Sequence, residues 1–294
     1  MRGRLPLFGE LVVVRNRVYD LLEVTQRLAQ RRDLYLIAGQ LSCLLAGTSC
    51  DLGYPQAGIE QARAACTYGE LIGHDGVWAY AQGQLATFFS LDGQLRRSLR
   101  HARAGQQRAA PGSAMLRLRG LEALACSRLG LADQADQALL AADRAREESR
   151  GDDEIHDRTG GMFTSTPAKR AYLAAMTHIH LGHADDTIRE ASTAIELWTS
   201  GPPGECASSA LAVARVDLVT AHLLRGELDA AEQAAGPLLA VAPEQRTTIV
   251  LTRLDGLQQH LADGRYAGAA EAEQLGAQLE DFRAASALHR LPPG

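Results

Sequence analysis

The stretch "LLRGELDAAEQAAGPLLAVAP", residues 223–243, combines a turn glycine with small residues at regular intervals. Counted from Gly226, Ala231 lies at +5, Ala235 at +9 and Leu238 at +12. The residues before the glycine, "ALAVARVDLVTAHLL", repeat apolar side chains at intervals of three and four, which is typical of a helix. Glycine adopts the left-handed backbone that ends a helix, and small residues allow a second helix to approach closely. The stretch therefore predicts a helical hairpin with a small-residue seam.

The same spacing recurs along the chain, with further copies at Gly53, Gly93, Gly130, Gly182 and Gly264. The Gly53 copy reads as one residue short, with Ala57 at +4, and the Gly264 copy is weaker, with Ala269, Glu273 and Gly276 in the seam positions. A single hairpin cannot bury its own apolar face, so neighbouring hairpins must stack. The chain is therefore expected to be all-α, a right-handed α-solenoid of about six hairpins with an additional N-terminal helix.

We expect two regions, an N-terminal segment with a packing helix over residues 1–32 and the solenoid over residues 33–294. One insertion, residues 147–167, accounts for the longest interval between turn glycines. It is polar and glycine-bearing, and Met162 and Phe163 are two apolar residues in it that are expected to be exposed. Long loops of this kind tend to be functional. The sequence leaves two alternatives open, a loop that folds over a concave groove and a mobile linker.

Composition excludes several classes of protein. The 294 residues are 46% hydrophobic, 22% charged and only 5% aromatic, with a net charge of -5, which argues against nucleic-acid binding. No apolar run is long enough to cross a membrane, and the N-terminal patch does not read as a signal peptide. The scattered, odd set of cysteines suits buried thiols in a reducing cytoplasm rather than disulfides or zinc: Cys43, Cys50, Cys66, Cys126 and Cys206.

The spacing resembles the tetratricopeptide repeat (TPR), a helix–turn–helix solenoid unit of 34 residues. Gly226, its small residues and Pro243 fall where that repeat has its glycine, its small residues and its closing proline, and the resemblance covers roughly residues 33–285. The repeats here are longer than the family standard. An aromatic residue usually lies four positions before the turn glycine, and histidines replace it at His178, His222 and His260.

Longer stretches, among them "GGMFTSTPAKRAYLAAMTHIHLG" (160–182) and "ALAVARVDLVTAHLLRGELDAA" (210–231), resemble the C-terminal repeat region of actinobacterial helix-turn-helix regulators of the XRE type. Because the repeat pattern begins by about residue 10, we expect this chain to lack the DNA-binding domain of those regulators. The resemblance thus implies a cytoplasmic, non-enzymatic module that receives a peptide, protein or small signal and passes it to transcription, without cofactor, metal or direct nucleic-acid binding. A homodimer through an end repeat is also compatible with it.

TPR geometry implies which side chains face the groove: Tyr80, Gln84, Thr87, Arg117, Lys169, Tyr172, Met176, Asp217 and Thr220. Met162 and Phe163 join them as ligand-contacting candidates from the loop. Two other functions stay open. An assembly scaffold would use its ends and outer face, where Arg96, Arg100 and Arg103 form a basic stripe. An enzyme or enzyme accessory would use the 147–167 loop as a lid.

Several polar motifs read as structural. His178, His180 and His183 are not expected to converge, because the first two lie about 200° apart on a helix and the third follows the turn glycine. Glu122 occupies a position expected to be buried, so it must be paired. The run from Asp152 to His156 reads as a solvated acidic segment rather than a metal loop.

The two segments "RVD" (Arg215, Asp217) and "RLD" (Arg253, Asp255) occupy the same position in consecutive repeats. Within each segment the arginine and the aspartate are two residues apart, so their side chains point to different faces of the helix. Each side chain is therefore expected to pair with a residue of a neighbouring repeat. No phosphate-binding loop, nucleophile elbow or metalloprotease motif is found in the sequence.

Overall fold

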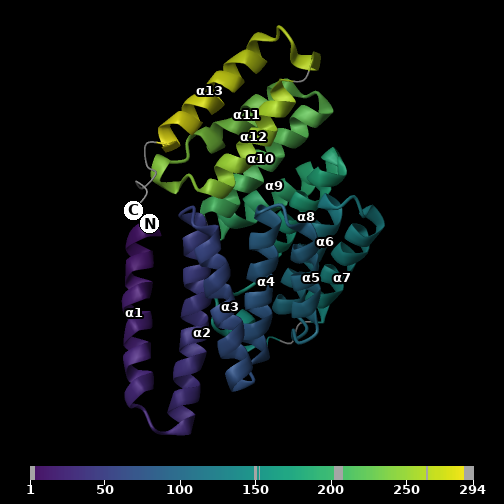
Figure 1. Cartoon of the computed structure of the whole chain (residues 1–294). Coiled ribbons are helices and arrows are strands. Elements are labelled where there is room, and N and C mark those ends of the chain that lie inside the picture. Colours follow the sequence, from purple (N-terminus) through teal and green to yellow (C-terminus); the bar gives the residue numbers. More distant parts are fainter. Residues whose placement is uncertain (1–3, 149–150, 152, 202–207, 263, 288–294) are drawn as a thin grey trace. The chain divides into compact units, whose positions relative to one another are not determined.

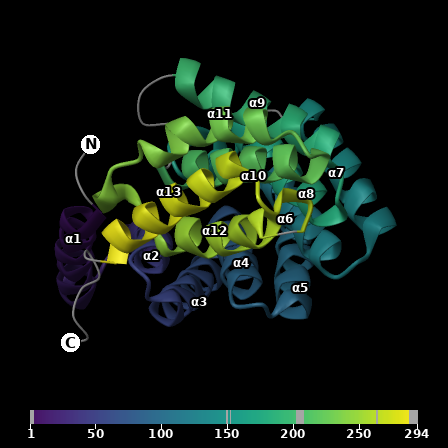
Figure 2. The ribbon, with the colours of Figure 1, turned by 90° about the horizontal axis from the view of Figure 1, so that it is seen from above.

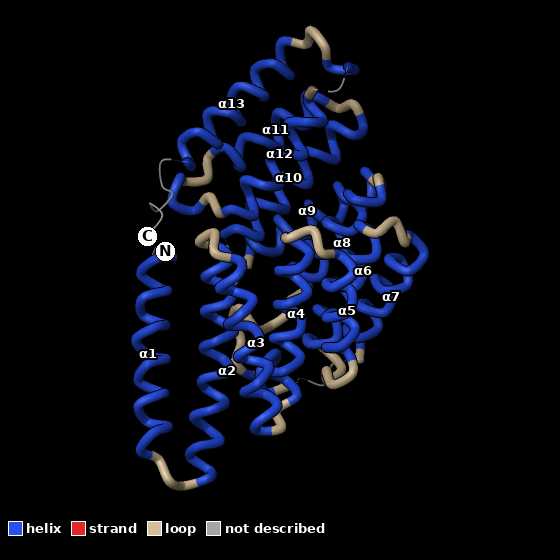
Figure 3. Tube along the Cα trace, in the orientation of Figure 1, coloured by secondary structure: helices blue, strands red, loops and turns tan. Residues whose placement is uncertain are grey.

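A computed structural model describes residues 4–148, 151, 153–201, 208–262 and 264–287. Within these ranges the chain consists of helices and short connections, with no strand (Figures 1 and 3). This confirms the all-α class and the stacking of consecutive hairpins. The chain forms two compact units, Met1–Thr166 and Pro167–Gly294. No helix among the described residues is both long enough and apolar enough to span a membrane.

The first unit holds an N-terminal helix, three consecutive hairpins and a short helical turn. In chain order its helices are α1 (Arg4–Val24), α2 (Leu28–Asp51), α3 (Pro55–Ile72), α4 (Asp75–Leu91), α5 (Leu95–Gln106), α6 (Ser113–Arg128) and α7 (Ala132–Glu147). The helical turn η1 (Glu154–Arg158) follows within the insertion. Each helix packs on the next, and α4 also contacts α2 and α6 (Figures 1 and 2).

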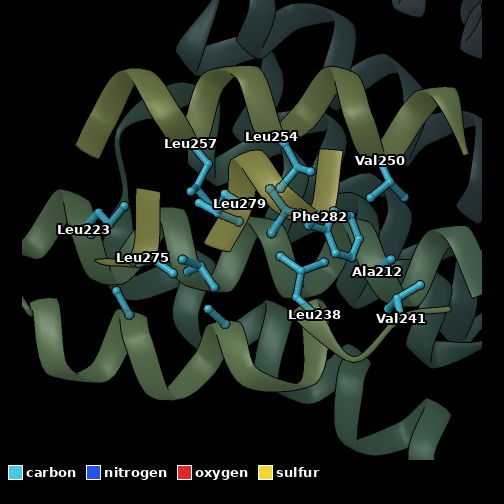
Figure 4. Packing of buried hydrophobic residues seen from close by; sticks show 14 of the residues in the cluster. Ala212, Leu223, Leu238, Val241, Val250, Leu254, Leu257, Leu275, Leu279 and Phe282 are labelled. Carbon is cyan, nitrogen blue, oxygen red and sulfur yellow. The ribbon is translucent and has the colours of Figure 1, made fainter. Parts of the chain in front are cut away.

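The second unit holds two regular hairpins and a less regular helix pair. Its elements are α8 (Pro167–Leu181), α9 (Ala184–Ser200), α10 (Ser208–Arg225), α11 (Leu228–Leu239), η2 (Pro243–Gln245), α12 (Thr248–Leu261), η3 (Gly264–Tyr266) and α13 (Ala270–Ala287). Apolar side chains of α10 to α13 converge in one core, to which α12 contributes Val250, Leu254 and Leu257 (Figure 4). Leu279 and Phe282 of α13 meet them there (Figure 4).

Five of the six hairpin turns have the same hydrogen-bonded geometry. At Gly226 (φ 80°), the glycine N–H donates to the carbonyl of Leu223, and the N–H of Glu227 donates to that of His222, both at 2.9 Å. The second type of bond, from the residue after the glycine to the residue four before it, recurs at 2.8–3.0 Å at Gly53, Gly93, Gly130 and Gly182. These bonds satisfy carbonyls that would otherwise lack partners at the helix end, and the left-handed backbone they require explains the glycine.

The seam positions are buried as the spacing predicts, but the register predicted for the Gly53 copy was wrong by one residue. In the Gly226 hairpin Ala231, Ala235 and Leu238 are fully buried. In the Gly53 hairpin, Ala57 at +4 is exposed, whereas Gly58 at +5 is buried. A Cβ on Gly58 would lie 2.9 Å from the carbonyl oxygen of Ala46. The first copy is therefore in register, and a glycine fills its seam position where a side chain would collide with the backbone of α2.

The prediction for the last copy was wrong. The residue with positive φ is Gly268 (79°) and not Gly264, and α13 begins at Ala270. Glu273, predicted for the seam, is exposed, and α13 instead buries Leu275 and Leu279 against α11 and α12. The turn here contains a 3-10 segment, so the hairpin loses the shared geometry.

The N-terminal helix differs in extent from its prediction. Helix α1 ends at Val24 and α2 already starts at Leu28, whereas the sequence places the first repeat helix from residue 33. Val18 of α1 packs on Ala38 and Leu41 of α2. The division of the chain at residue 32 stays a prediction.

Candidate functional site

The insertion folds onto the first unit. Helix α7 ends at Glu147 and α8 begins at Pro167, and the short turn η1 between them lies against α4 and α6. We call residues 148–166 the insertion loop, and the surface of α2, α4 and α6 that it contacts the loop-covered face. The sequence left two alternatives open, a loop that folds over a concave groove and a mobile linker. The described part of the loop packs on the first helices of the hairpins, which agrees with the first alternative.

Two apolar side chains anchor the loop. Ile155 is fully buried and Phe163 is 5% exposed, and both pack among buried residues of α2, α3 and α4, including Cys43, Ala65 and Val77. Burial of one such side chain contributes roughly 1.5–3 kcal/mol. These two anchors lie on either side of Gly160 and attach the loop to the first unit at two points.

Tyr80 of α4 is the centre of the contact. Its ring centroid lies 4.7 Å from that of Phe163, and its hydroxyl donates to the carbonyl of Met162 at 3.2 Å. From the other side, Arg117 of α6 donates to the Tyr80 carbonyl at 3.1 Å and places its guanidinium 4.4 Å from the ring centroid. Burial raises the pKa of the Tyr80 hydroxyl, which therefore stays a donor at neutral pH.

The acidic end of the loop is only partly solvated. Glu154 is exposed as predicted, but the prediction was wrong for Asp153 and His156. Asp153 is 8% exposed and His156 is fully buried. The Asp153 carboxylate accepts hydrogen bonds from the backbone N–H groups of Ile155 and His156 and lies 3.1 Å from Nδ1 of His156. Burial alone would raise the pKa of Asp153, but the bonds from His156 and Ile155 outweigh it and lower the pKa. Asp152 lies outside the described residues.

Met162 is the predicted site residue that the loop presents to solvent. Its side chain is 44% exposed. A Cβ built on Gly47 of α2 would lie 3.6 Å from both the Met162 methyl group and the Gln84 amide nitrogen, so these two groups border one spot on the loop-covered face. Gln84 itself is buried and donates to the Cys43 carbonyl at 2.8 Å. Thr87 is half-buried, and its hydroxyl donates to the Gly83 carbonyl.

The structure thus brings together several predicted residues of the first unit, but it covers most of them. Tyr80, Gln84 and Phe163 are buried, so solvent does not reach most of their side-chain surface. Arg117 is half-buried and Met162 exposed. Sequence reasoning could not place the loop, and it missed Ile155, whose one signal is an isolated apolar residue within an acidic run.

In the second unit the predicted groove residues are all buried or half-buried. Met176 and Thr220 are buried, and the Thr220 hydroxyl donates to the carbonyl four residues before it. Tyr172 is half-buried, with its ring centroid 5.5 Å from that of Trp198. Lys169 is half-buried.

Asp217 is buried in α10, where its carboxylate lies 3.6 Å from Arg253 of α12. This confirms an ion pair between neighbouring repeats. Asp255 of α12 pairs with Arg283 of α13, within its own helix pair, so the prediction of a partner in a neighbouring repeat was wrong for Asp255. Arg215 instead donates to the carbonyl of Pro237 at 2.9 Å.

Glu122 is paired as its burial requires. It is 6% exposed and accepts hydrogen bonds from Arg103 at 2.7 Å, Gln106 at 2.8 Å and Arg119 at 2.9 Å. Burial alone would raise its pKa, but these donors outweigh burial and lower it, so the side chain stays a carboxylate. All three arginines of the predicted basic stripe, Arg96, Arg100 and Arg103, are exposed, and Arg103 has Glu122 as a structural partner.

The described cysteines are free thiols, and three of them, Cys43, Cys50 and Cys126, are buried. Burial raises the pKa of the Cys50 thiol to about 11 and that of Cys66 to about 12, which disfavours the reactive thiolate. Cys206 lies outside the described residues.

The histidines of the Gly182 turn are closer than the sequence predicts. The ring centroids of His178 and His183 lie 5.8 Å apart, while His180 points elsewhere and approaches Arg253 at 3.4 Å. The prediction that the three histidines do not converge therefore holds for His180 but not for the pair His178 and His183, which the turn itself brings together. The equivalent pair at Gly226 is joined by a contact of 2.9 Å between His222 and Glu227.

No protein-family model and no curated protein matches this chain. Among solved structures it is similar to a tetratricopeptide repeat protein from Parabacteroides merdae, with 12% sequence identity and a TM-score of 0.45. That similarity covers 95% of this chain and 98% of the other. The consecutive helical hairpins and their glycine turns make the fold TPR-like.

Proposed function

We propose that this chain is a non-enzymatic binding module that recognises a peptide, a protein or a small signal through the loop-covered face of its first unit, and that it acts in transcriptional regulation. The observation that carries the proposal is the anchored insertion loop, which holds Met162 exposed beside α2. Stacked helical hairpins lend themselves to this use, because their first helices together form an extended surface.

The chemistry of the exposed spot suits an apolar side chain of a partner. Methionine is flexible and polarisable, and it adapts to partner surfaces of different shape. The carbonyl of Met162 is held by Tyr80, and Tyr80 is held by Arg117, so the backbone that presents the methionine is fixed before a partner binds. A surface organised in advance lowers the entropic cost of binding.

The link to transcription rests on the likeness of residues 160–182 and 210–231 to the repeat regions of helix-turn-helix regulators. The first of these stretches begins inside the insertion loop and includes Met162. If the proposal holds, proteins recovered with this chain include a DNA-binding regulator.

The test compares two charge substitutions on exposed apolar residues of the same unit. Met162→Asp places a carboxylate on the loop-covered face, and Leu140→Asp places one on α7, where Leu140 is 62% exposed. Each tagged protein is used to recover partners from extracts of its own host, with quantitative mass spectrometry. We expect a partner that wild type and Leu140→Asp retain and Met162→Asp loses.

The opposite result, a partner lost with Leu140→Asp and retained with Met162→Asp, would reject the loop-covered face. An assembly scaffold would then be the better reading, and the exposed residues Arg96 and Arg100 of α5 would be reversed in charge next. The enzymatic alternative is disfavoured by Glu122, since this carboxylate is buried and held by three donors rather than available as an acid or base.

A further inference from the structure

The turn at Gly182 gathers three side chains that could each supply a metal ligand. His178 lies in the last turn of α8, His183 directly precedes α9, and Asp186 lies in the first turn of α9. One ligand atom of each residue lies within 4.8 Å of those of the other two. Two imidazoles and one carboxylate are typical ligands of zinc and related ions.

The shared turn geometry explains why these residues meet. The N–H of His183 donates to the His178 carbonyl at 3.0 Å, as in the other regular turns, so the residue four before the glycine always lies beside the residue after it. The first turn of the next helix then adds a third position, four after the glycine. The backbone fixes the relative placement of all three side chains before any ion binds.

The donor set is particular to this turn and is not a requirement of the fold. In the other four regular turns the same three positions carry Ser49, Tyr54 and Ala57; Phe89, Gln94 and Arg97; Cys126, Leu131 and Gln134; and His222, Glu227 and Ala230. None of these sets offers imidazole or carboxylate at all three positions. Packing of the hairpin therefore does not account for the combination at Gly182.

We infer that His178, His183 and Asp186 form a binding site for a divalent transition-metal ion, with Zn²⁺ the best match to the donors. Zinc–ligand bonds of roughly 2.0–2.2 Å place tetrahedral ligand atoms about 3.3 Å apart. His183 is exposed and the other two are half-buried, so side-chain rotation can bring the three atoms to that spacing. Three protein ligands leave a coordination position open to solvent. Magnesium and calcium are less suitable because they prefer oxygen ligands throughout.

Arg189 competes with the ion for the carboxylate. Its guanidinium donates to Asp186 Oδ1 at 2.6 Å, and its other terminal nitrogen lies 3.6 Å from Oε1 of Glu190. When a metal binds, Arg189 has to release at least part of its contact with Asp186, for which Glu190 is an alternative partner. Substitution of Arg189 is therefore expected to strengthen metal binding, whereas loss of any ligand weakens it.

The test is calorimetric titration of Zn²⁺ into the full chain, without an affinity tag and with its thiols kept reduced. We expect one saturable site per chain, weakened at least about tenfold in His183→Asn and in Asp186→Asn. Arg189→Gln is expected to bind more tightly than wild type. The matched control is His180→Asn, which removes a histidine of the same helix outside the cluster and leaves the affinity unchanged.

Two results would overturn the assignment. One is the absence of saturable binding to wild type. The other is binding that persists at full strength in the double variant His183→Asn/Asp186→Asn, which would place the ion on thiols or elsewhere. Titration with Co²⁺ separates these sites independently, since thiolate ligands give a charge-transfer absorption that imidazole and carboxylate ligands lack. Circular dichroism of each variant checks that the helices are retained.

Discussion

Arg253 of α12 lies 3.6 Å from the carboxylate of Asp217 in α10 and joins two consecutive repeats of the second unit. Asp217 is 2% exposed, and among the described atoms its Oδ2 has no hydrogen-bond partner. Burial raises the pKa of Asp217, and the charge of Arg253 only partly opposes this. The pair thus specifies which helices meet, at a cost in desolvation that a single partner does not fully offset.

Asp217→Asn is expected to change how stability depends on pH. Because the pKa of Asp217 in the folded chain lies above the unfolded value of 3.8, Asp217 keeps its proton up to a higher pH in the folded chain than in the unfolded chain. Stability therefore falls as pH rises from the unfolded pKa through the raised folded pKa, and this contribution is absent from the variant. Urea unfolding of both proteins across that pH range measures it. Identical curves for the two proteins would mean that Asp217 does not titrate with a raised pKa in the folded chain.

His101 is expected to make the first unit less stable in mild acid. Burial, followed by the neighbouring charges of Arg100, Arg97 and Arg63, lowers its pKa from 6.5 to about 4. Between these values the unfolded chain takes up a proton that the folded chain does not, so stability falls as pH drops from 6.5 towards about 4. His101→Gln should lose less stability over this interval than wild type, as followed by urea unfolding. Equal losses in the two proteins would contradict the assignment.

The two glycines near α13 give a test of the irregular last turn. Gly268→Ala forces a side chain onto a backbone with φ of 79° and should cost about 1–2 kcal/mol. Gly264→Ala should be neutral or slightly stabilising, because nothing lies within 4 Å of the added carbon and no left-handed φ is required. Thermal unfolding of both variants decides between them. A larger loss of stability in Gly264→Ala than in Gly268→Ala would mean that Gly264 is the turn glycine, as the sequence spacing predicts.

The spacing of the turn glycines predicted most of the fold because it reports a local requirement. A left-handed residue must end each first helix, and small residues must follow at fixed distances, wherever the hairpin lies in the chain. The errors occur where this local rule is ambiguous. Ala57 was assigned to the seam although Gly58 fills that position, and Gly264 was chosen over Gly268 although only Gly268 has a left-handed φ.

The candidate site was less predictable because it depends on long-range contacts. Spacing within helices cannot show that Phe163 and Ile155 cover Tyr80, about 80 residues earlier, so buried residues were taken for groove residues. The meeting of His178 and His183 was missed for a different reason. Helical periodicity applies up to the turn glycine and not across it, whereas the hydrogen bonds of the turn determine the contact.

Phe163→Ala is expected to release the insertion loop while the hairpins stay folded. Removal of a ring that is 5% exposed sacrifices most of the apolar burial at that end of the loop, and every 1.4 kcal/mol lost raises the population of the open loop about tenfold. Limited trypsin digestion measures opening directly, because Arg158 lies exposed within the loop. Cleavage after Arg158 should be at least about tenfold faster than in wild type.

Met162→Ala is the matched control, since this neighbouring side chain is 44% exposed and its loss should leave the cleavage rate unchanged. Equal cleavage rates in Phe163→Ala and wild type would mean that the phenyl ring does not hold the loop, and the loop-covered face would then lose its principal anchor.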